Sequence, residues 1–96
     1  MTSKKLSVMY KVKLSESAIK FYSKCDKNVA KKLNRCFETL KIDPYSSNNV
    51  KKLTGDLKDY FRFRLGDYRV IYKIDEATKQ VVIRTIEHRS NIYKTN

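Results

Sequence analysis

Residues 60–72, with the sequence YFRFRLGDYRVIY, contain the pattern that decides the fold. In the first half, two phenylalanines and a leucine alternate with two arginines, which is the period-two pattern of a half-buried β-strand. Gly66 and Asp67 are residue types that a two-residue hairpin loop accepts. Residues 68–74 are rich in β-branched and aromatic side chains. The stretch therefore predicts a β-hairpin that turns at Gly66 and Asp67.

A two-residue loop at this point determines which side chains share a face of the sheet. Arg64 would pair with Arg69, and Arg62 with Ile71, and directly opposed residues point to the same face. Three guanidiniums would then project together, while the other face is filled by Phe61, Phe63, Leu65, Val70 and Tyr72. Because like charges set side by side usually destabilise a sheet, we interpret this crowding as a site for an anion.

The composition indicates one globular domain, residues 1–96, with a strongly basic surface. The chain has 41% hydrophobic residues, and 22 basic against 10 acidic residues give a net charge of +12. Such a charge favours nucleic acid, an acidic protein or an anionic membrane as partner. No apolar run approaches the roughly 20 residues that cross a bilayer, and no secretory signal follows Met1, so we expect a cytoplasmic protein with no membrane contact.

Cysteine and histidine are too few for a finger-type zinc site. Cys25 and Cys36 are the only cysteines, they form no Cys-x-x-Cys pair, and His88 is the only histidine. We expect both thiols to be small core residues, and we expect no metal and no cofactor.

The remaining elements are predicted from periodicity and capping residues. Residues 6–14 alternate as a strand, Ser15 can cap a short helix, and Asp26 can cap a longer helix that ends at residues 43–44. The longer helix has an apolar stripe formed by Val29, Leu33, Cys36, Phe37 and Leu40. Residues 45–50 read as a loop, and residues 80–88 as a last strand. The fold class is α+β: strand, helix, helix and three strands, with two N-terminal helices packed on one face of a mostly antiparallel sheet.

The register of the last strand decides what joins the arginines. If residues 76–79 form the preceding loop, Arg69 pairs with Ile86. Val82, Arg84, Ile86 and His88 then share the face of Arg69, while Val81, Ile83 and Thr85 enter the core. A loop one residue longer or shorter would place Glu87 beside the arginines instead of His88. We expect the first register because it keeps Arg84 out of the core, although a bulge would overturn it.

Such a face has the groups for cleaving RNA without a metal ion. The reaction needs a base for the 2′-hydroxyl, cations for the phosphorane and an acid for the leaving 5′-oxygen. His88 can serve in either proton transfer, and Tyr93 can be the acid or a stacking partner. Each residue also has a plainer interpretation: the arginines as an ordinary charged sheet face, His88 as a solvated strand end, and Tyr93 as a tail residue on the core. The clustering itself indicates an anion site and does not specify a nuclease.

Three groups of residues carry a resemblance to a known family. They are Lys-Leu-Thr-Gly at 52–55, Gly-Asp-Tyr-Arg at 66–69 and His-Arg-Ser-Asn-Ile-Tyr at 88–93. With the strand–helix–helix opening, they make nearly the whole chain similar to the RelE/ParE superfamily of toxins from type II toxin–antitoxin systems. The resemblance implies a RelE-like fold and an mRNA endoribonuclease that acts in the ribosomal A site, without metal, through 2′-hydroxyl attack. It also implies that a cognate antitoxin protein holds the toxin inactive, and that operator DNA is contacted only indirectly, through the antitoxin.

The resemblance also implies roles for individual residues. Arg69 matches an arginine that contacts the scissile phosphate, and the other expected catalytic residues are Arg62, Arg64, His88 and Tyr93. The expected RNA-binding residues are Lys51, Lys52, Arg84 and Arg89. Glu87 departs from the family pattern, since many relatives have glycine there; it could pair with an arginine and weaken the phosphate site, or help as a base.

Two other functions remain open from the sequence. A ParE-like toxin has the same fold but poisons DNA gyrase, and a basic RNA-binding module would bind without cleaving. We further expect an acidic or amphipathic antitoxin segment to cover the basic face or to displace the C-terminal tail.

Overall fold

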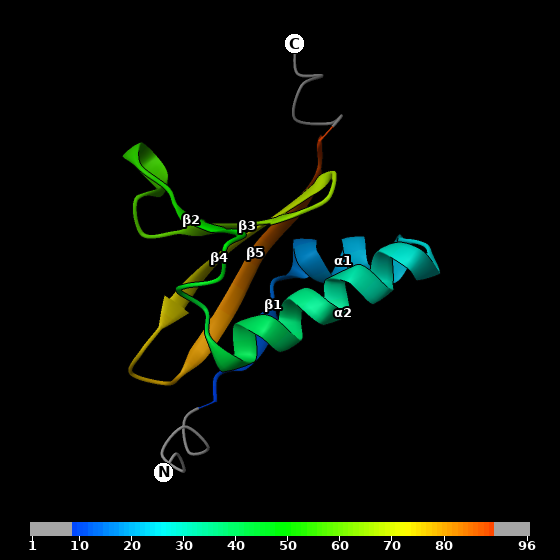
Figure 1. Cartoon of the computed structure of the whole chain (residues 1–96). Coiled ribbons are helices and arrows are strands. Elements are labelled where there is room, and N and C mark those ends of the chain that lie inside the picture. Colours follow the sequence, from blue (N-terminus) through cyan, green and yellow to red (C-terminus); the bar gives the residue numbers. More distant parts are fainter. Residues whose placement is uncertain (1–8, 90–96) are drawn as a thin grey trace.

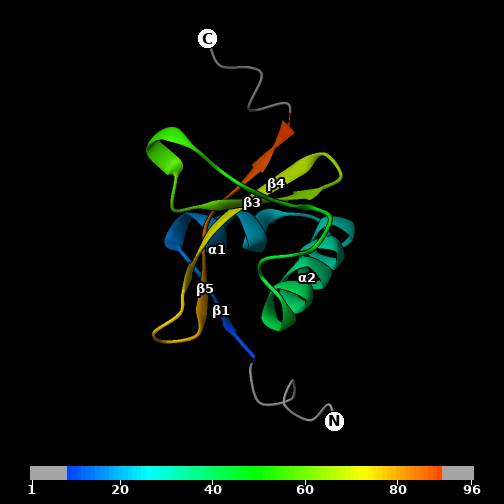
Figure 2. The same ribbon diagram turned by 60° about the vertical axis from the view of Figure 1, so that its left-hand side comes forward.

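The computed structural model describes residues 9–89, which form two helices packed on one face of a five-stranded sheet (Figures 1 and 2). The strands lie in the order β1-β5-β4-β3-β2, with β1 parallel to β5 and the other neighbours antiparallel. The predicted α+β class, with both helices on one face of a mostly antiparallel sheet, is confirmed. In chain order the elements are β1 (Lys11–Leu14), α1 (Glu16–Lys24), α2 (Lys27–Ile42), β2 (Val50–Lys52), the 3-10 helix η2 (Gly55–Leu57), β3 (Phe61–Leu65), β4 (Tyr68–Asp75) and β5 (Gln80–His88).

Both helices begin at the capping residues that the sequence predicts. The Ser15 hydroxyl accepts a hydrogen bond of 3.1 Å from the backbone N–H of Ala18 and caps α1. The Asp26 carboxylate accepts one of 3.0 Å from the N–H of Val29 and caps α2. The helix α2 ends at Ile42, just before the Asp-Pro pair, as expected.

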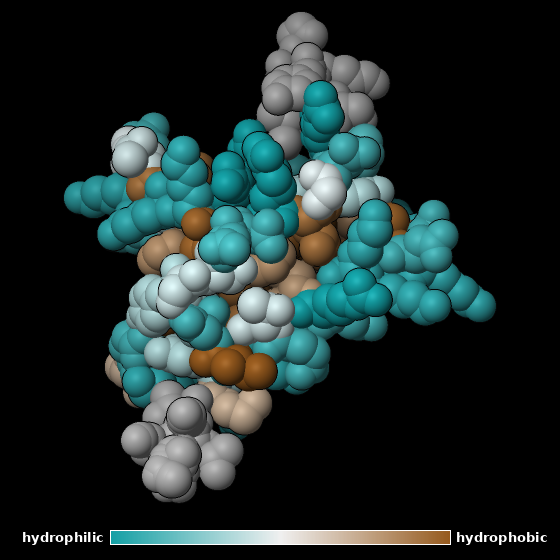
Figure 3. Space-filling view, viewed as in Figure 1, coloured by the Kyte–Doolittle hydropathy of each residue, from teal (hydrophilic) through white to brown (hydrophobic). Residues whose placement is uncertain are grey.

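The core lies between the helices and the sheet. Leu33, Cys36 and Leu40 of α2 are buried there, and Val29 and Phe37 of the predicted stripe are partly buried. The sheet contributes buried side chains from its three central strands: Phe63, Val70, Tyr72, Val81, Ile83 and Ile86. Hydrophilic side chains cover most of the face shown in Figure 3, and apolar side chains show between the sheet and the helices.

The β3–β4 hairpin has the predicted register. Leu65 pairs with Tyr68, so Gly66 and Asp67 form a two-residue loop. Gly66 has φ of 63°, a conformation that glycine adopts without steric cost. The next pair joins Arg64 to Arg69, and two residues further along β3, on the same face, Arg62 pairs with Ile71.

The β4–β5 pair differs from the prediction in its second half. Asp75 pairs with Gln80, as expected, and the pairing continues to Tyr72 and Ile83. The register then shifts, because Ile71 pairs with Thr85 and Arg84 has no partner on β4. An extra residue of this kind is a β-bulge, and it reverses the face of every residue that follows.

Two smaller differences concern the edges of the sheet. Residues 50–52 were expected to belong to the loop and to the two lysines that follow it. They form instead the short edge strand β2, in which Val50 pairs with Phe63 and Lys52 pairs with Phe61 of β3. The first strand begins at Lys11; residues 6–8 of the predicted strand lie outside the described part of the chain. With β2, the sheet has one more strand than the sequence predicts.

Candidate nucleic-acid interface

Cross-strand pairs gather basic side chains on the sheet face opposite the helices. One row joins Lys51 of β2 to Arg62, Ile71 and Thr85 on the following strands. The next row joins Arg64, Arg69 and Glu87. We call the surface formed by Lys51, Arg62, Arg64, Arg69 and Glu87 the arginine face. The predicted juxtaposition of the three arginines is therefore observed.

A cavity of about 310 Å³ opens on the arginine face. Four guanidinium-bearing residues line it, and the hairpin turn closes one end: Arg62, Arg64, Arg69, Arg89, Gly66, Asp67 and Tyr68. Asp67 is the acidic residue of this lining, and its carboxylate lies 3.6 Å from the guanidinium of Arg89. The cavity therefore has a strong excess of positive charge, which favours an anion.

Arg62 is held in an unfavourable state in the isolated protein. Its Nε is buried and has no hydrogen-bond partner among residues 9–89. Burial lowers the pKa of the Arg62 guanidinium from its ordinary value, and the neighbouring charges of Arg64 and Arg69 lower it further. A buried unsatisfied donor costs about 1–3 kcal/mol, so a phosphate that accepts from this group would relieve both costs.

A second cavity adjoins the first and shares Arg69 with it. It has a volume of about 340 Å³ and lies between the segment 53–57 and the sheet. Its lining combines apolar side chains with charged ones: Leu53, Thr54, Leu57, Arg69, Ile71, Arg84, Thr85 and Glu87. Arg69 therefore stands between a strongly basic cavity and a mixed one that contains a carboxylate.

Arg84 reaches this region although the bulge removes it from the ladder. Its guanidinium donates a hydrogen bond of 3.3 Å to the Tyr60 hydroxyl and lies 5.2 Å from the centre of the Tyr60 ring. Lys73 lies 5.6 Å from the centre of the same ring. Neither Tyr60 nor Lys73 is among the predicted site residues, although Tyr60, just before β3, has the parity of Arg62, and Lys73 on β4 has the parity of Arg69.

The expectation that His88 joins the arginines is wrong. After the bulge at Arg84, His88 pairs with Tyr68 and Glu87 pairs with Arg69. The imidazole of His88 lies on the helix side of the sheet, edge-to-face with the Tyr68 ring at 4.7 Å. For the same reason Ile86 is buried in the core and Thr85 lies on the arginine face, the reverse of the prediction. Glu87 takes the place opposite Arg69 that was expected for Ile86, so a carboxylate and not the imidazole lies on the arginine face.

The other predicted site residues divide between the two faces. Lys51 pairs with Arg62 and shares its face, whereas Lys52 pairs with Phe61 and its ammonium lies 5.9 Å from that ring on the other face. Arg89 lines the basic cavity. Tyr93 lies outside the described residues.

Lysine from α2 also approaches the hairpin turn. The ammonium of Lys32 lies 3.8 Å from the position that a Cβ would take on Gly66. Lys32 is not among the predicted site residues, because the approach of α2 to the turn is a tertiary contact that helical periodicity does not report.

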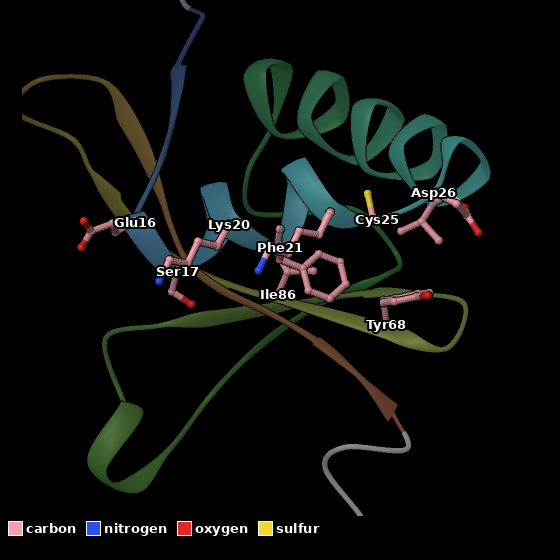
Figure 4. A pocket seen from close by; sticks show the side chains of 10 residues that line it. Glu16, Ser17, Lys20, Phe21, Cys25, Asp26, Tyr68 and Ile86 are labelled. Atoms are coloured by element: carbon pink, nitrogen blue, oxygen red, sulfur yellow. Dashed lines mark hydrogen bonds between the residues drawn. The ribbon is translucent and has the colours of Figure 1, made fainter.

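A larger apolar groove lies on the helix side, between α1 and the end of the sheet (Figure 4). It has a volume of about 690 Å³, and Phe21, Tyr68 and Ile86 form its apolar wall. The rings of Phe21 and Tyr68 meet edge-to-face at 5.8 Å. No arginine of the arginine face lines this groove within the described chain, and Tyr68 is the one residue that lines both the groove and the basic cavity.

Residues 9–89 contain neither a metal-binding cluster nor a membrane-spanning helix. Among residues 9–89, no three His, Cys, Asp or Glu side chains come together in a way that could hold a metal ion. No helix in that part of the chain is long and apolar enough to span a membrane.

The sequence of this basic, five-stranded α+β protein matches a family of toxins. Residues 12–93 match the family described as the ParE toxin of the type II toxin–antitoxin system parDE, and the chain belongs to this family. The expected resemblance to the RelE/ParE superfamily is thereby confirmed.

Relatives named RelE extend the match. A putative toxin RelE4 from Methanocaldococcus jannaschii is 26% identical over 87 residues, covering 90% of this chain and 93% of the relative. In the toxin–antitoxin complex RelBE2 from Mycobacterium tuberculosis, one chain superposes with a TM-score of 0.76 at 28% identity, covering 85% of this chain and all of that one. The archaeal RelE–RelB complex from Pyrococcus horikoshii gives a TM-score of 0.73 at 29% identity, over 85% of this chain and 97% of that chain.

Proposed function

We propose that this protein is the toxin of a type II toxin–antitoxin system and acts as a ribosome-dependent endoribonuclease that cleaves mRNA in the A site. The observation that carries the proposal is the cavity of about 310 Å³ in which Arg62, Arg64 and Arg69 converge from adjacent strands. The relatives named RelE support the same branch of the superfamily.

The proposed reaction uses the arginines as preorganised cations. Attack of the 2′-hydroxyl on the adjacent phosphate places extra negative charge on the phosphorane oxygens. Guanidiniums already fixed around that position stabilise this charge without reorganising during the reaction. Arg69 would contact the scissile phosphate because it lies between Arg64 and the second cavity, and Arg62 and Arg64 would bind the remaining oxygens.

Other basic residues would guide the RNA. We assign Lys51, Lys52, Arg84 and Arg89 to RNA binding, with Lys52 contacting RNA from the strand edge because it does not share the arginine face. Tyr93 remains our candidate for the acid or for a stacking partner. We no longer assign a proton transfer to His88, because it lies on the helix side of the sheet.

We propose a cognate antitoxin as the regulating partner. The solved relatives from M. tuberculosis and P. horikoshii are toxin–antitoxin and RelE–RelB complexes. An acidic antitoxin segment over the arginine face would neutralise charges that repel one another in the free toxin. Operator DNA would be bound through the antitoxin, and the toxin itself would act on ribosomes in the cytoplasm.

The test is to map mRNA 5′ ends after induction of the wild-type chain and of Arg69→Ala. We expect growth arrest and cuts within translated codons for the wild type, and neither for the variant. The variant must be as abundant and as stable to heat as the wild type, so that lost activity is not lost folding. Intact mRNA in cells whose growth has been arrested by the wild-type chain would refute the proposal.

A second candidate is gyrase poisoning, which the family description favours because it names the ParE toxin. It predicts trapped double-strand breaks on purified gyrase and intact mRNA. A binding module without chemistry predicts ribosome association with neither outcome. The induction experiment therefore separates the nuclease from the other two functions, and the gyrase assay separates those two from each other.

A further inference from the structure

Glu87 is the carboxylate that the bulge brings to the arginine face. It pairs directly with Arg69 across the β4–β5 ladder, and paired residues point to the same face with Cβ atoms about 4.5–5.5 Å apart. Glu87 also lines the second cavity together with Arg69 and Arg84. Its placement is thus set by register and by a cavity, two independent features of the sheet.

The Glu87 carboxylate has no hydrogen-bond or ion-pair partner among the described residues. No ion pair or hydrogen bond joins its side chain to another residue of 9–89, whereas the nearby Asp67 pairs with Arg89. The charged groups that face it are Arg69 on β4, Arg84 on its own strand and, one strand further, Arg64. Segment 53–57, on the other side of the cavity, contributes the uncharged side chains Leu53, Thr54 and Leu57.

We propose that Glu87 is the general base that takes the proton of the attacking 2′-hydroxyl. This inference rests on the proposed ribonuclease function and deepens it. Arg64, Arg69 and Glu87 lie in one row across three neighbouring strands, which are about 4.8 Å apart. A phosphodiester held by Arg64 and Arg69 therefore has the adjacent ribose beside Glu87.

The reaction balances without an added reagent. The Glu87 carboxylate accepts the 2′-hydroxyl proton as the O2′–P bond forms, and the P–O5′ bond breaks with its electron pair going to O5′. The O5′ alkoxide is protonated by an acid or by water, and Glu87 then releases its proton to solvent. The products are a 2′,3′-cyclic phosphate and a 5′-hydroxyl.

A competing role for Glu87 is electrostatic only. A carboxylate opposite Arg69 could simply reduce repulsion among the arginines, and removing it would then increase affinity for RNA. The two roles predict opposite effects on the rate of cleavage. Glu87→Gln keeps the shape and removes the charge and the basicity, so it distinguishes them.

The experiment is single-turnover cleavage of mRNA on programmed ribosomes with saturating toxin. For Glu87→Gln we expect a rate about 10²- to 10⁴-fold lower than that of the wild type, with ribosome binding retained. Glu87→Asp, which restores a carboxylate one methylene shorter, should recover part of the rate.

Two further variants serve as comparisons. Glu38→Gln removes an exposed α2 carboxylate that pairs with Lys41 and lines neither cavity of the arginine face, so it should leave the rate unchanged. His88→Gln tests the residue that the sequence had favoured. If Glu87→Gln cleaves as fast as the wild type, or if His88→Gln loses as much of the cleavage rate as Glu87→Gln does, the assignment of Glu87 is overturned. If the wild type cleaves no mRNA, the proposed ribonuclease function itself is refuted, independently of the role of Glu87.

Discussion

The Ser15 hydroxyl donates a hydrogen bond of 2.6 Å to the backbone carbonyl of Arg84, the extra residue of the β5 bulge. The same oxygen accepts the N–H of Ala18 and caps α1. One small side chain therefore starts a helix and contacts the bulge that places Glu87, and not His88, on the arginine face. The start of α1 and the composition of the site are physically connected.

Ser15→Ala should lower both stability and activity. It removes a helix cap and a hydrogen bond to the bulge, which together contribute about 1–2 kcal/mol to the free energy of unfolding. Urea titration followed by circular dichroism measures this loss. Ser17→Ala, two residues further along and exposed on α1, is the matched control and should change little. Equal stability of the two variants would show that the Ser15 contacts contribute nothing.

The hairpin could be predicted from the sequence because its register is a local property. Once Gly66 and Asp67 form the loop, parity alone pairs Arg64 with Arg69 and places Arg62 on the same face. The helix caps at Ser15 and Asp26 were equally local, since each needs only an oxygen near the first turn.

The bulge could not be predicted, because the contacts around it join distant parts of the chain. Arg84 lies just beyond the stretch of β5 that pairs in parallel with β1, and its carbonyl is bonded to Ser15. The alternation of residues 80–88 carries no information about the pairing with β1 or about the hydrogen bond to Ser15. The edge strand β2 was missed for a related reason: three residues show too little alternation to be recognised without their partner β3.

Gly66→Ala should destabilise the hairpin by about 1 kcal/mol, because its φ of 63° is strained for any residue with a Cβ. No clash adds to this cost, since the nearest atom, the ammonium of Lys32, would lie 3.8 Å from the new Cβ. Gly55→Ala is a matched control, with φ of 68° and no atom within 4 Å of the new Cβ. Both variants should lose similar stability in thermal unfolding. Only Gly66→Ala should weaken RNA binding, because Gly66 lines the basic cavity on the arginine face. Equal RNA binding by both would argue against that cavity as the site.

Glu76 should make stability depend on pH in the acidic range. Hydrogen bonds from Lys79, Tyr45 and Tyr10 lower the pKa of the Glu76 carboxyl to about 2, from an ordinary value of 4.5. Because the folded-state pKa is depressed, the contribution of Glu76 is fully present above about pH 4.5 and is lost as the pH falls toward 2. Glu76→Gln should therefore flatten the dependence of unfolding free energy on pH between these values.

Tyr45→Phe provides an independent check on this network. It removes one of the hydroxyls that donate to Glu76 and should flatten the same pH dependence only in part. Urea unfolding at several pH values measures both variants. A wild-type slope unchanged in Glu76→Gln would mean that other carboxyls cause the acid sensitivity.

Arg62→Met should make the free protein more stable and the toxin less active. The substitution keeps an apolar stem at a half-buried position while removing a buried, unsatisfied Nε and the repulsion from Arg64 and Arg69. We expect the free energy of unfolding to rise by about 1 kcal/mol, since the unsatisfied donor alone costs about 1–3 kcal/mol. We expect ribosome binding and mRNA cleavage to fall, because a phosphate loses a fixed cation.

Lys51→Met is the matched comparison. Lys51 pairs with Arg62, so the substitution also removes one positive charge from this row of the sheet, but the Lys51 side chain is exposed, and stability should stay nearly unchanged. If Arg62→Met were less stable than the wild type, Arg62 would be a structural residue, and the crowding of guanidiniums would no longer indicate an anion site.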